Sequence, residues 1–207
     1  MTKIKICGIT NIEDALTAAR FGASALGFNF YSQSPRFISD EEALKIVQKL
    51  PSGVCKIGVF VNEQTQNVNE ISQALGLDAV QLHGDETPDY CRQITTKVIK
   101  AIRVKDENDL EIMPQYTVWA FILDSHSLGF GGSGQRFDWR PAARKLAGLS
   151  SDAHIILSGG LTAQNVSEAI EVFKPYAVDV CSGVESVAGV KDYQKLARFI
   201  EAVKAVL

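Results

Sequence analysis

The sequence predicts an α/β protein folded as a (β/α)₈ barrel, the TIM-barrel fold in which eight parallel strands alternate with helices. Eight short apolar segments recur along the 207 residues. Most of them are continuously apolar rather than alternating, as expected for parallel strands that are buried on both faces. Stretches with the apolar spacing of helices lie between them, and the chain has the length of a compact barrel.

The expected strands are short and consist largely of Ile, Val, Ala, Leu and Phe. They cover residues 4–6, 25–28, 55–61, 79–82, 98–102, 119–123, 155–157 and 177–180. The first strand ends at Cys7, and Gly8 after it indicates a turn. Thr10 is expected to open the first helix, because Glu13 three residues later would complete a capping box.

The expected helices follow the strands in regular alternation. They cover residues 14–21, 39–50, 66–75, 87–93, 106–113, 141–147, 165–173 and 192–206. Ser39 and Glu42 form a second capping box at the start of the second helix. The segment 106–113 has the weakest helical pattern of the set.

A doubly wound open sheet is the alternative to the barrel. Open sheets usually have fewer strands, and many carry a GxGxxG motif after the first strand, which this sequence lacks. The strand count and the chain length therefore favour the barrel. No linker or low-complexity segment divides the chain, so residues 1–207 are expected to form one catalytic domain.

Composition and charge restrict the class of protein. The net charge of −3 provides no basic surface for nucleic acid or anionic membranes. The sequence has neither the apolar run of a signal peptide nor a stretch that could span a bilayer, so we expect a soluble, cytoplasmic protein. The four cysteines lack metal-ligand spacing and are expected to be free thiols, with no bound metal. The oligomeric state stays open, and a monomer is compatible with the sequence.

In a (β/α)₈ barrel the active site lies at the carboxyl ends of the strands. Polar residues and glycines at these ends are Cys7, Asn29, Asn62, His83, Arg103, Asp124, Ser158, Gly159, Gly160, Ser182 and Gly183. Cys7 could be a buried apolar residue or a reactive thiol. Asp124 could cap a loop or donate a proton, because desolvation in an apolar barrel favours the neutral carboxyl group.

Two kinds of glycine-rich segment follow the later strands. Residues 127–134 suit either a mobile cover over a substrate or a flexible surface loop. The turns after the seventh and eighth strands occupy the places where this fold often binds phosphate through backbone N–H groups. Gly159, Gly160, Ser182 and Gly183 are therefore expected to bind a phosphorylated small molecule.

Two further side chains are candidates for substrate binding. Arg36 follows the second strand and could hold a carboxylate bidentately, with Phe30 or Phe37 beside an aromatic ring. A solvated surface arginine is the alternative. His83 could act as an acid or a base, but we interpret it as a hydrogen-bonded residue of the pocket wall.

Together these motifs resemble the phosphoribosylanthranilate isomerase family of aromatic amino acid (tryptophan) biosynthesis. The matching segments are 5–10, 27–30, 34–36, 58–62, 80–86, 123–125, 131–134, 137–139, 158–161, 178–180 and 182–185. The resemblance implies a barrel without a cofactor, in which Cys7 is the general base and Asp124 the general acid. It also implies that Arg36 holds the anthranilate carboxylate. Cys181 is a departure, because serine is common at that position of the family.

The resemblance implies an Amadori rearrangement of N-(5-phosphoribosyl)anthranilate to 1-(2-carboxyphenylamino)-1-deoxyribulose 5-phosphate. Asp124 would protonate the ring oxygen, and Cys7 would remove the proton from C2. One alternative is another phosphosugar isomerase or epimerase, such as the histidine-pathway enzyme, but those families usually have an Asp in place of Cys7 and lack Arg36. The other is a barrel that only binds phosphorylated metabolites, which needs no acid facing a thiol.

Cys7 and Cys181 end the first and eighth strands, which are neighbours in a closed barrel. Their Cα atoms could therefore be close enough for a disulfide, but the sequence does not determine the direction of their Cβ atoms. We favour the simpler interpretation, in which Cys181 packs in place of serine.

Overall fold

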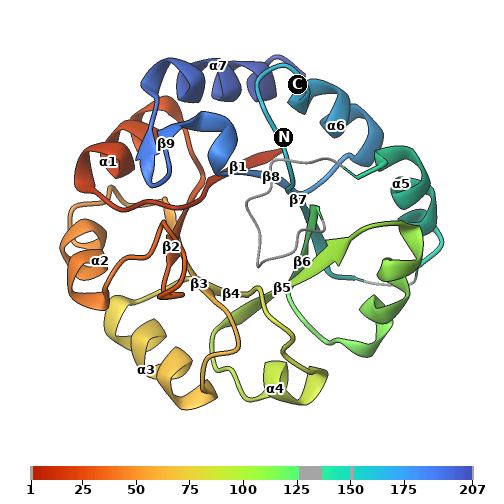
Figure 1. Cartoon of the computed structure of the whole chain (residues 1–207), viewed down its shortest axis with the longest axis horizontal. Helices are drawn as coiled ribbons and strands as arrows, with labels where there is room; N and C mark the ends of the chain where they lie inside the picture. Colours follow the sequence, from red (N-terminus) through yellow and green to blue (C-terminus); the bar gives the residue numbers. More distant parts are fainter. Residues whose placement is uncertain (1, 126–136, 150–151, 207) are drawn as a thin grey trace.

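The computed structural model describes residues 2–125, 137–149 and 152–206. Eight parallel strands form a closed barrel in chain order, and pairing of β1 with β8 closes it. Figure 1 looks down this barrel and shows the helices as an outer ring. The predicted (β/α)₈ barrel is therefore confirmed, and the open sheet is excluded because an open sheet would leave its first and last strands unpaired.

All eight predicted strands form, with ends that differ by at most a few residues. They are β1 (Lys3–Ile6), β2 (Ala25–Asn29), β3 (Cys55–Phe60), β4 (Ala79–Leu82), β5 (Lys97–Val104), β6 (Ala120–Ser125), β7 (His154–Leu157) and β8 (Ala177–Val180). The helices that cover them are α1 (Ile12–Phe21), α2 (Asp40–Val47), α3 (Thr65–Leu75), α4 (Pro88–Arg92), α5 (Trp139–Ala147), α6 (Val166–Phe173) and α7 (Tyr193–Lys204).

The segment with the weakest helical pattern forms a 3₁₀ helix, η1 (Glu107–Gln115), in place of an α-helix. Its two buried residues, Leu110 and Met113, are three positions apart. This spacing matches the three residues per turn of a 3₁₀ helix. Pro114 lacks a backbone N–H and its ring crowds the preceding turn, which further disfavours an α-helix.

The predicted capping box of Thr10 and Glu13 is wrong. Asn11 caps α1 instead, and its side chain accepts a hydrogen bond of 2.8 Å from the backbone N–H of Asp14. The Thr10 hydroxyl donates to the carbonyl of Gly189, 2.5 Å away. The second predicted box, Ser39 with Glu42, is confirmed at the start of α2.

The interior of the barrel is polar toward the carboxyl ends of the strands and apolar below them. One buried cluster contains only strand residues, which places it inside the barrel; its members are Ile57, Ala79, Ile99, Ala101, Ala120, Ile122, Ile156 and Ala177. Lys5, Gln81 and Asp179 are also strand residues, and each is almost completely buried. Because these polar side chains lie nearer the carboxyl ends of their strands, the apolar cluster forms a floor beneath them.

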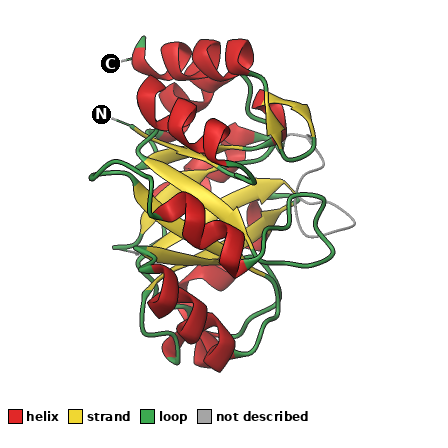
Figure 2. Cartoon of the chain, turned by 90° about the vertical axis from the view of Figure 1, so that its left-hand side faces the viewer, coloured by secondary structure: helices red, strands yellow, loops and turns green. Residues whose placement is uncertain are grey.

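The connection from β8 to α7 is the most elaborate in the described part of the chain. It contains a 3₁₀ turn, η2 (Ser182–Val184), and an antiparallel hairpin of β9 (Glu185–Val187) and β10 (Val190–Lys191). In Figure 1 the hairpin lies between α1 and α7, and Figure 2 shows both chain termini at one end of the barrel. None of the helices in the described ranges has the length and apolar character needed to cross a bilayer.

Asn11→Ala should lower the free energy of unfolding by about 1 kcal/mol, because the mutation removes the side-chain acceptor at the start of α1. Urea denaturation followed by circular dichroism measures the change. Glu13→Ala is the matched control and should cost less, because Glu13 lies in the first turn of α1 and interacts favourably with the helix dipole without capping the helix. If Glu13→Ala lowered the free energy of unfolding more than Asn11→Ala, the result would support Thr10 and Glu13 as the capping residues instead.

Candidate active site

A cavity of about 430 Å³ lies at the carboxyl ends of the strands. Its lining includes the predicted catalytic residues, Cys7 and Asp124, and the polar and glycine residues predicted to bind the substrate, namely Arg36, His83, Gly159, Gly160, Ser182 and Gly183. Asp124 lies at the end of β6 and the others lie in the connections after β1, β2, β4, β7 and β8, so the barrel gathers them from the whole length of the chain. The glycine-rich segment 127–134, expected to be a cover or a surface loop, lies outside the described residues.

Several residues expected near the site do not line the cavity. Asn62 instead accepts a hydrogen bond of 2.7 Å from the backbone N–H of Asp85, and Arg103 forms an ion pair with Asp85. Phe30 stacks on Phe60 with ring centroids 5.1 Å apart. Neither Phe30 nor Phe37 lines the cavity, so the structure gives no support to either as the neighbour of an aromatic ring. Tyr31 is the aromatic residue that lines the cavity.

Pairing of β1 with β8 positions Cys7. The register opposes Ile6 to Val180, and the backbone N–H of Cys7 donates to the Val180 carbonyl at 2.9 Å. The next residue has to be glycine, because Gly8 has a φ of +72°. A Cβ atom there would lie 2.7 Å from Arg36 Cδ and 2.9 Å from Cys181 Sγ. Gly8 therefore lets Cys7, Cys181 and Arg36 approach one another.

The surroundings of Cys7 favour the thiolate. A hydrogen bond from the Cys181 thiol and the nearby Lys5 ammonium lower the pKa of Cys7, burial raises it, and the net pKa is about 6. Lys5 forms a buried ion pair of 2.8 Å with Asp179. Burial disfavours the Lys5 ammonium, but the Asp179 and Cys7 charges raise the pKa of Lys5 overall. Lys5 therefore supplies a permanent positive charge beneath the thiol.

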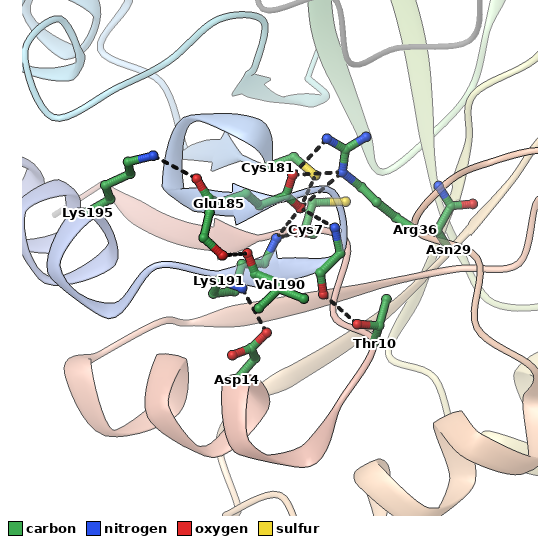
Figure 3. A network of polar contacts seen from close by, with 12 residues as sticks. Cys7, Thr10, Asp14, Asn29, Arg36, Cys181, Glu185, Val190, Lys191 and Lys195 are labelled. Carbon is green, nitrogen blue, oxygen red and sulfur yellow. Dashed lines mark hydrogen bonds and ion pairs between the residues drawn. The ribbon is translucent and has the colours of Figure 1, made fainter.

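Cys7 and Cys181 are both free cysteines, as predicted for all four cysteines. Cys181 donates a hydrogen bond to Cys7 and is buried. Both effects raise the pKa of Cys181 well above its ordinary value. Cys181 therefore stays protonated when Cys7 is ionised. Its sulfur also lies 3.6 Å from Glu185 Oε1. Figure 3 draws the two sulfur atoms beside one another.

Asp124 lies at the end of β6 and is held from two sides. Its Oδ1 accepts a hydrogen bond of 2.9 Å from the backbone N–H of Ser125. Its Oδ2 lies 3.2 Å from His83 Nε2, close enough for an ion pair but not aligned for a hydrogen bond. His83 Nδ1 contacts Gln81 Nε2 at 2.7 Å, which supports its interpretation as a wall residue. His83 thus lies within proton-transfer reach of Asp124.

Arg36 reaches the cavity from the connection after β2 and pairs with Glu185. Its Nη2 lies 2.7 Å from Glu185 Oε2. The hydrogen bonds to Glu185 outweigh burial and raise the pKa of Arg36, which therefore carries its charge at all relevant pH values. The alternative of a solvated surface arginine is wrong, because the Arg36 side chain is only 15% exposed.

The two predicted phosphate loops face the same cavity. Gly159 and Gly160 have φ values of +88° and +64°. Within the described ranges, the backbone N–H groups of Gly159, Gly160 and Ser182 have no hydrogen-bond acceptor. Ser182 begins η2, where the first N–H groups of a helix are left free. These free donors can bind an anion.

Sequence reasoning gave no role to five polar residues of the site or its surroundings, which are Lys5, Gln81, Asp179, Glu185 and Lys191. Three of them interrupt otherwise apolar strands, and this interruption was a usable signal, because strand interiors seldom hold unpaired charge. Lys5 and Cys7 also have the two-residue spacing that places side chains on one face of a strand. Among the described residues, no cluster of His, Cys, Asp and Glu is suited to a metal ion.

The rate of Cys7 alkylation by iodoacetamide should rise with pH and reach half its maximum near pH 6, because the thiolate reacts and its pKa is about 6. Cys181→Ala should move this midpoint upward by removing the donor, whereas Cys181→Ser keeps a hydroxyl donor and should move it less. Mass spectrometry of the Cys7 peptide follows the reaction. Cys91, whose pKa burial raises to about 11, is an internal control. An unchanged midpoint in Cys181→Ala would contradict this account of the thiol.

Comparisons with known proteins agree with this geometry. The family model of N-(5'-phosphoribosyl)anthranilate (PRA) isomerase matches residues 4–202. The N-(5'-phosphoribosyl)anthranilate isomerase of Trichlorobacter lovleyi is 50% identical over 208 residues, which cover 100% of both chains. The crystal structure of phosphoribosyl anthranilate isomerase from Thermotoga maritima superposes with a TM-score of 0.93 at 43% identity, and the match covers 99% of this chain and 100% of the other.

A second solved structure contains a bound ligand. It is a phosphoribosyl anthranilate isomerase in complex with reduced 1-(o-carboxyphenylamino)-1-deoxyribulose 5-phosphate. It is 41% identical with a TM-score of 0.87, and the match covers 99% of this chain and 100% of that one. The family match begins within β1, spans the other seven strands of the barrel and includes all the cavity-lining residues named above. The chain therefore belongs to the N-(5'-phosphoribosyl)anthranilate isomerase family and is an isomerase of tryptophan biosynthesis.

Proposed function

We propose that this enzyme converts N-(5-phosphoribosyl)anthranilate into 1-(2-carboxyphenylamino)-1-deoxyribulose 5-phosphate, with Asp124 as general acid and Cys7 as general base. The observation that carries the proposal is a thiol and a carboxyl group lining one cavity, together with a pKa of about 6 for Cys7. The ligand bound to the solved relative supports the same chemistry, because it is a reduced form of this product.

The first step opens the sugar ring. Asp124 gives its proton to the furanose ring oxygen, and the bond from C1 to that oxygen breaks. The lone pair of the anilino nitrogen forms a double bond to C1, which produces a protonated Schiff base. His83, 3.2 Å from Asp124, is placed to orient the carboxyl group during this transfer.

The second step moves a proton from carbon to the thiolate. Cys7 takes the proton from C2, and the electron pair of that bond forms the C1–C2 double bond of an enolamine while the C1–N bond becomes single. The enolamine then loses its hydroxyl proton and gains one at C1, which gives the ketone. A thiolate is a suitable base here, because a pKa of about 6 leaves most Cys7 side chains ionised at neutral pH.

The remaining cavity residues suit the two ends of the substrate. Arg36 lines the cavity and carries a positive charge, which supports a role in holding the anthranilate carboxylate. The free N–H groups of Gly159, Gly160 and Ser182 belong to residues that line the same cavity, and they are suited to the phosphate. The family match favours this substrate over the other phosphosugars and over a barrel that only binds metabolites.

The turnover test uses loss of the fluorescence of N-(5-phosphoribosyl)anthranilate. Cys7→Ser and Asp124→Asn should each lower kcat by about 10²–10⁴-fold, the usual contribution of one acid or base. The serine hydroxyl is a far poorer base at neutral pH, and the asparagine amide has no acidic proton to give. Both variants should keep a normal circular dichroism spectrum and bind the reduced product. A kcat within threefold of the parent enzyme in either variant would exclude that residue from its role.

Gly160→Val should weaken binding of the reduced product and of inorganic phosphate by about 10- to 150-fold, the loss expected for about 1.5–3 kcal/mol of charged hydrogen bonding. The valine side chain blocks the approach of an anion to the backbone. Isothermal titration calorimetry measures the affinity. Gly53→Val is the matched control, because Gly53 also has a positive φ, +94°, and lies in open space. Equal losses of affinity in both variants would attribute the effect to backbone strain.

A further inference from the structure

Glu185 is the centre of a buried polar network beside the cavity, shown in Figure 3. Its carboxylate contacts Arg36, Lys191, Gly189 and Cys181, which come from three different segments of the chain. The Glu185 side chain is 4% exposed. A carboxylate buried this deeply has to be fully paired, and the way it is paired determines where its partners point.

Glu185 binds one particular edge of the Arg36 guanidinium. The Nε atom of Arg36 donates to Oε1 and Oε2 at 3.0 and 3.1 Å, and Nη2 donates to Oε2 at 2.7 Å. These contacts occupy the edge formed by Nε and Nη2. Among the described residues, all hydrogen bonds from the Arg36 side chain go to Glu185, so the opposite edge, formed by Nη1 and Nη2, stays available. A guanidinium can bind a second carboxylate bidentately through that edge.

Glu185 is itself fixed by groups that do not face the ligand. Lys191 Nζ lies 2.9 Å from Oε1, and the backbone N–H of Gly189 lies 3.3 Å from it. Lys191 is completely buried and also donates to the Cys7 carbonyl at 2.6 Å. The β9–β10 hairpin therefore holds the Glu185 carboxylate against the strand end that carries Cys7. A carboxylate with these anchors cannot follow Arg36 if the guanidinium turns away.

The charges of the network are balanced, with each anion held beside a cation. Glu185 carries one negative charge, and its pKa is lowered by Arg36 and Lys191, which outweigh burial. Arg36 and Lys191 carry two positive charges between them. The Cys7 thiolate adds a second negative charge beside this network and raises the pKa of Arg36, so a carboxylate that enters the cavity is attracted by the free edge of Arg36 and not by a surplus of charge.

We propose that Glu185 is a positioning residue that pins one edge of Arg36 and leaves the other edge for the carboxylate of the substrate's aromatic ring. This inference rests on the proposed function, in which Arg36 binds that carboxylate. A pinned guanidinium loses less side-chain freedom when the ligand binds, so the affinity rises without a direct contact from Glu185. The opposite arrangement, in which Glu185 competes with the ligand for Arg36, predicts the opposite sign.

A double-mutant cycle tests the proposal. Two ligands are titrated calorimetrically, the reduced product and its phenylamino counterpart without the carboxylate, against the parent enzyme, Glu185→Gln, Arg36→Met and the double variant. Glu185→Gln should weaken the carboxylate ligand by about 5- to 20-fold, in the range of coupling within one hydrogen-bond network. Glu185→Gln should change the affinity for the carboxylate-free ligand by less than twofold. When Arg36→Met is already present, adding Glu185→Gln should not change the affinity for either ligand.

Other variants separate positioning from a structural effect. Glu185→Asp keeps the charge and should restore part of the affinity, and Glu41→Gln, an exposed change on α2, is the matched control and should have no effect. If Glu185→Gln does not fold, Glu185→Met combined with Lys191→Met removes the buried anion and its cation together and is titrated in the same way. Steady-state kinetics should show a raised KM for the substrate, with kcat changed much less.

The outcomes distinguish this inference from the proposed function. If Arg36→Met weakens both ligands equally, the carboxylate role of Arg36 fails. If Arg36→Met discriminates between the ligands but Glu185→Gln does not, the positioning role of Glu185 alone is overturned. Tighter binding of the carboxylate ligand in Glu185→Gln would also overturn it, because that result identifies Glu185 as a competitor.

Discussion

The pairing of β1 with β8 is the constraint on which the active site depends. Its register opposes Lys5 to Asp179 and Ile6 to Val180, and the following residues, Cys7 and Cys181, are then neighbours. The buried Lys5–Asp179 ion pair specifies this register, because a shift by one residue would turn Lys5 toward the helices and leave both charges unpaired. The same ammonium lowers the pKa of Cys7, so one ion pair serves both the fold and the chemistry.

Above this ion pair the site is a set of charges joined by short contacts. Lys191 connects the Cys7 carbonyl to the Glu185 carboxylate, and Glu185 connects in turn to Arg36. The proposed base and the proposed carboxylate-binding group thus share one scaffold. Asp124 is supported separately, by Ser125 and His83 on the other side of the cavity. The proposed acid and the proposed base therefore rest on separate sets of contacts.

The strands and the residues at their carboxyl ends could be predicted because both depend on local patterns, namely apolar runs and the polar residues that end them. The helix cap could not be settled in this way, since Thr10 and Asn11 are both good caps and the contact of Thr10 with Gly189 decides between them. The partner of Arg36 was out of reach for a related reason. Glu185 lies 149 residues away, and only closure of the barrel and the hairpin after β8 bring the two together.

The closing pair also fixes the order in which the site can be assembled during synthesis. Cys7 is synthesised well before the strand that completes its site, because Asp179, the partner of Lys5, comes 174 residues after Lys5. Contacts between residues so far apart in the sequence cost the most loop-closure entropy, and they slow the folding of the chain. An incomplete chain therefore lacks the Cys181 thiol, whose hydrogen bond makes the largest contribution to the low pKa of Cys7. The reactive centre exists only once the whole barrel has closed, which spares the nascent chain an exposed nucleophile.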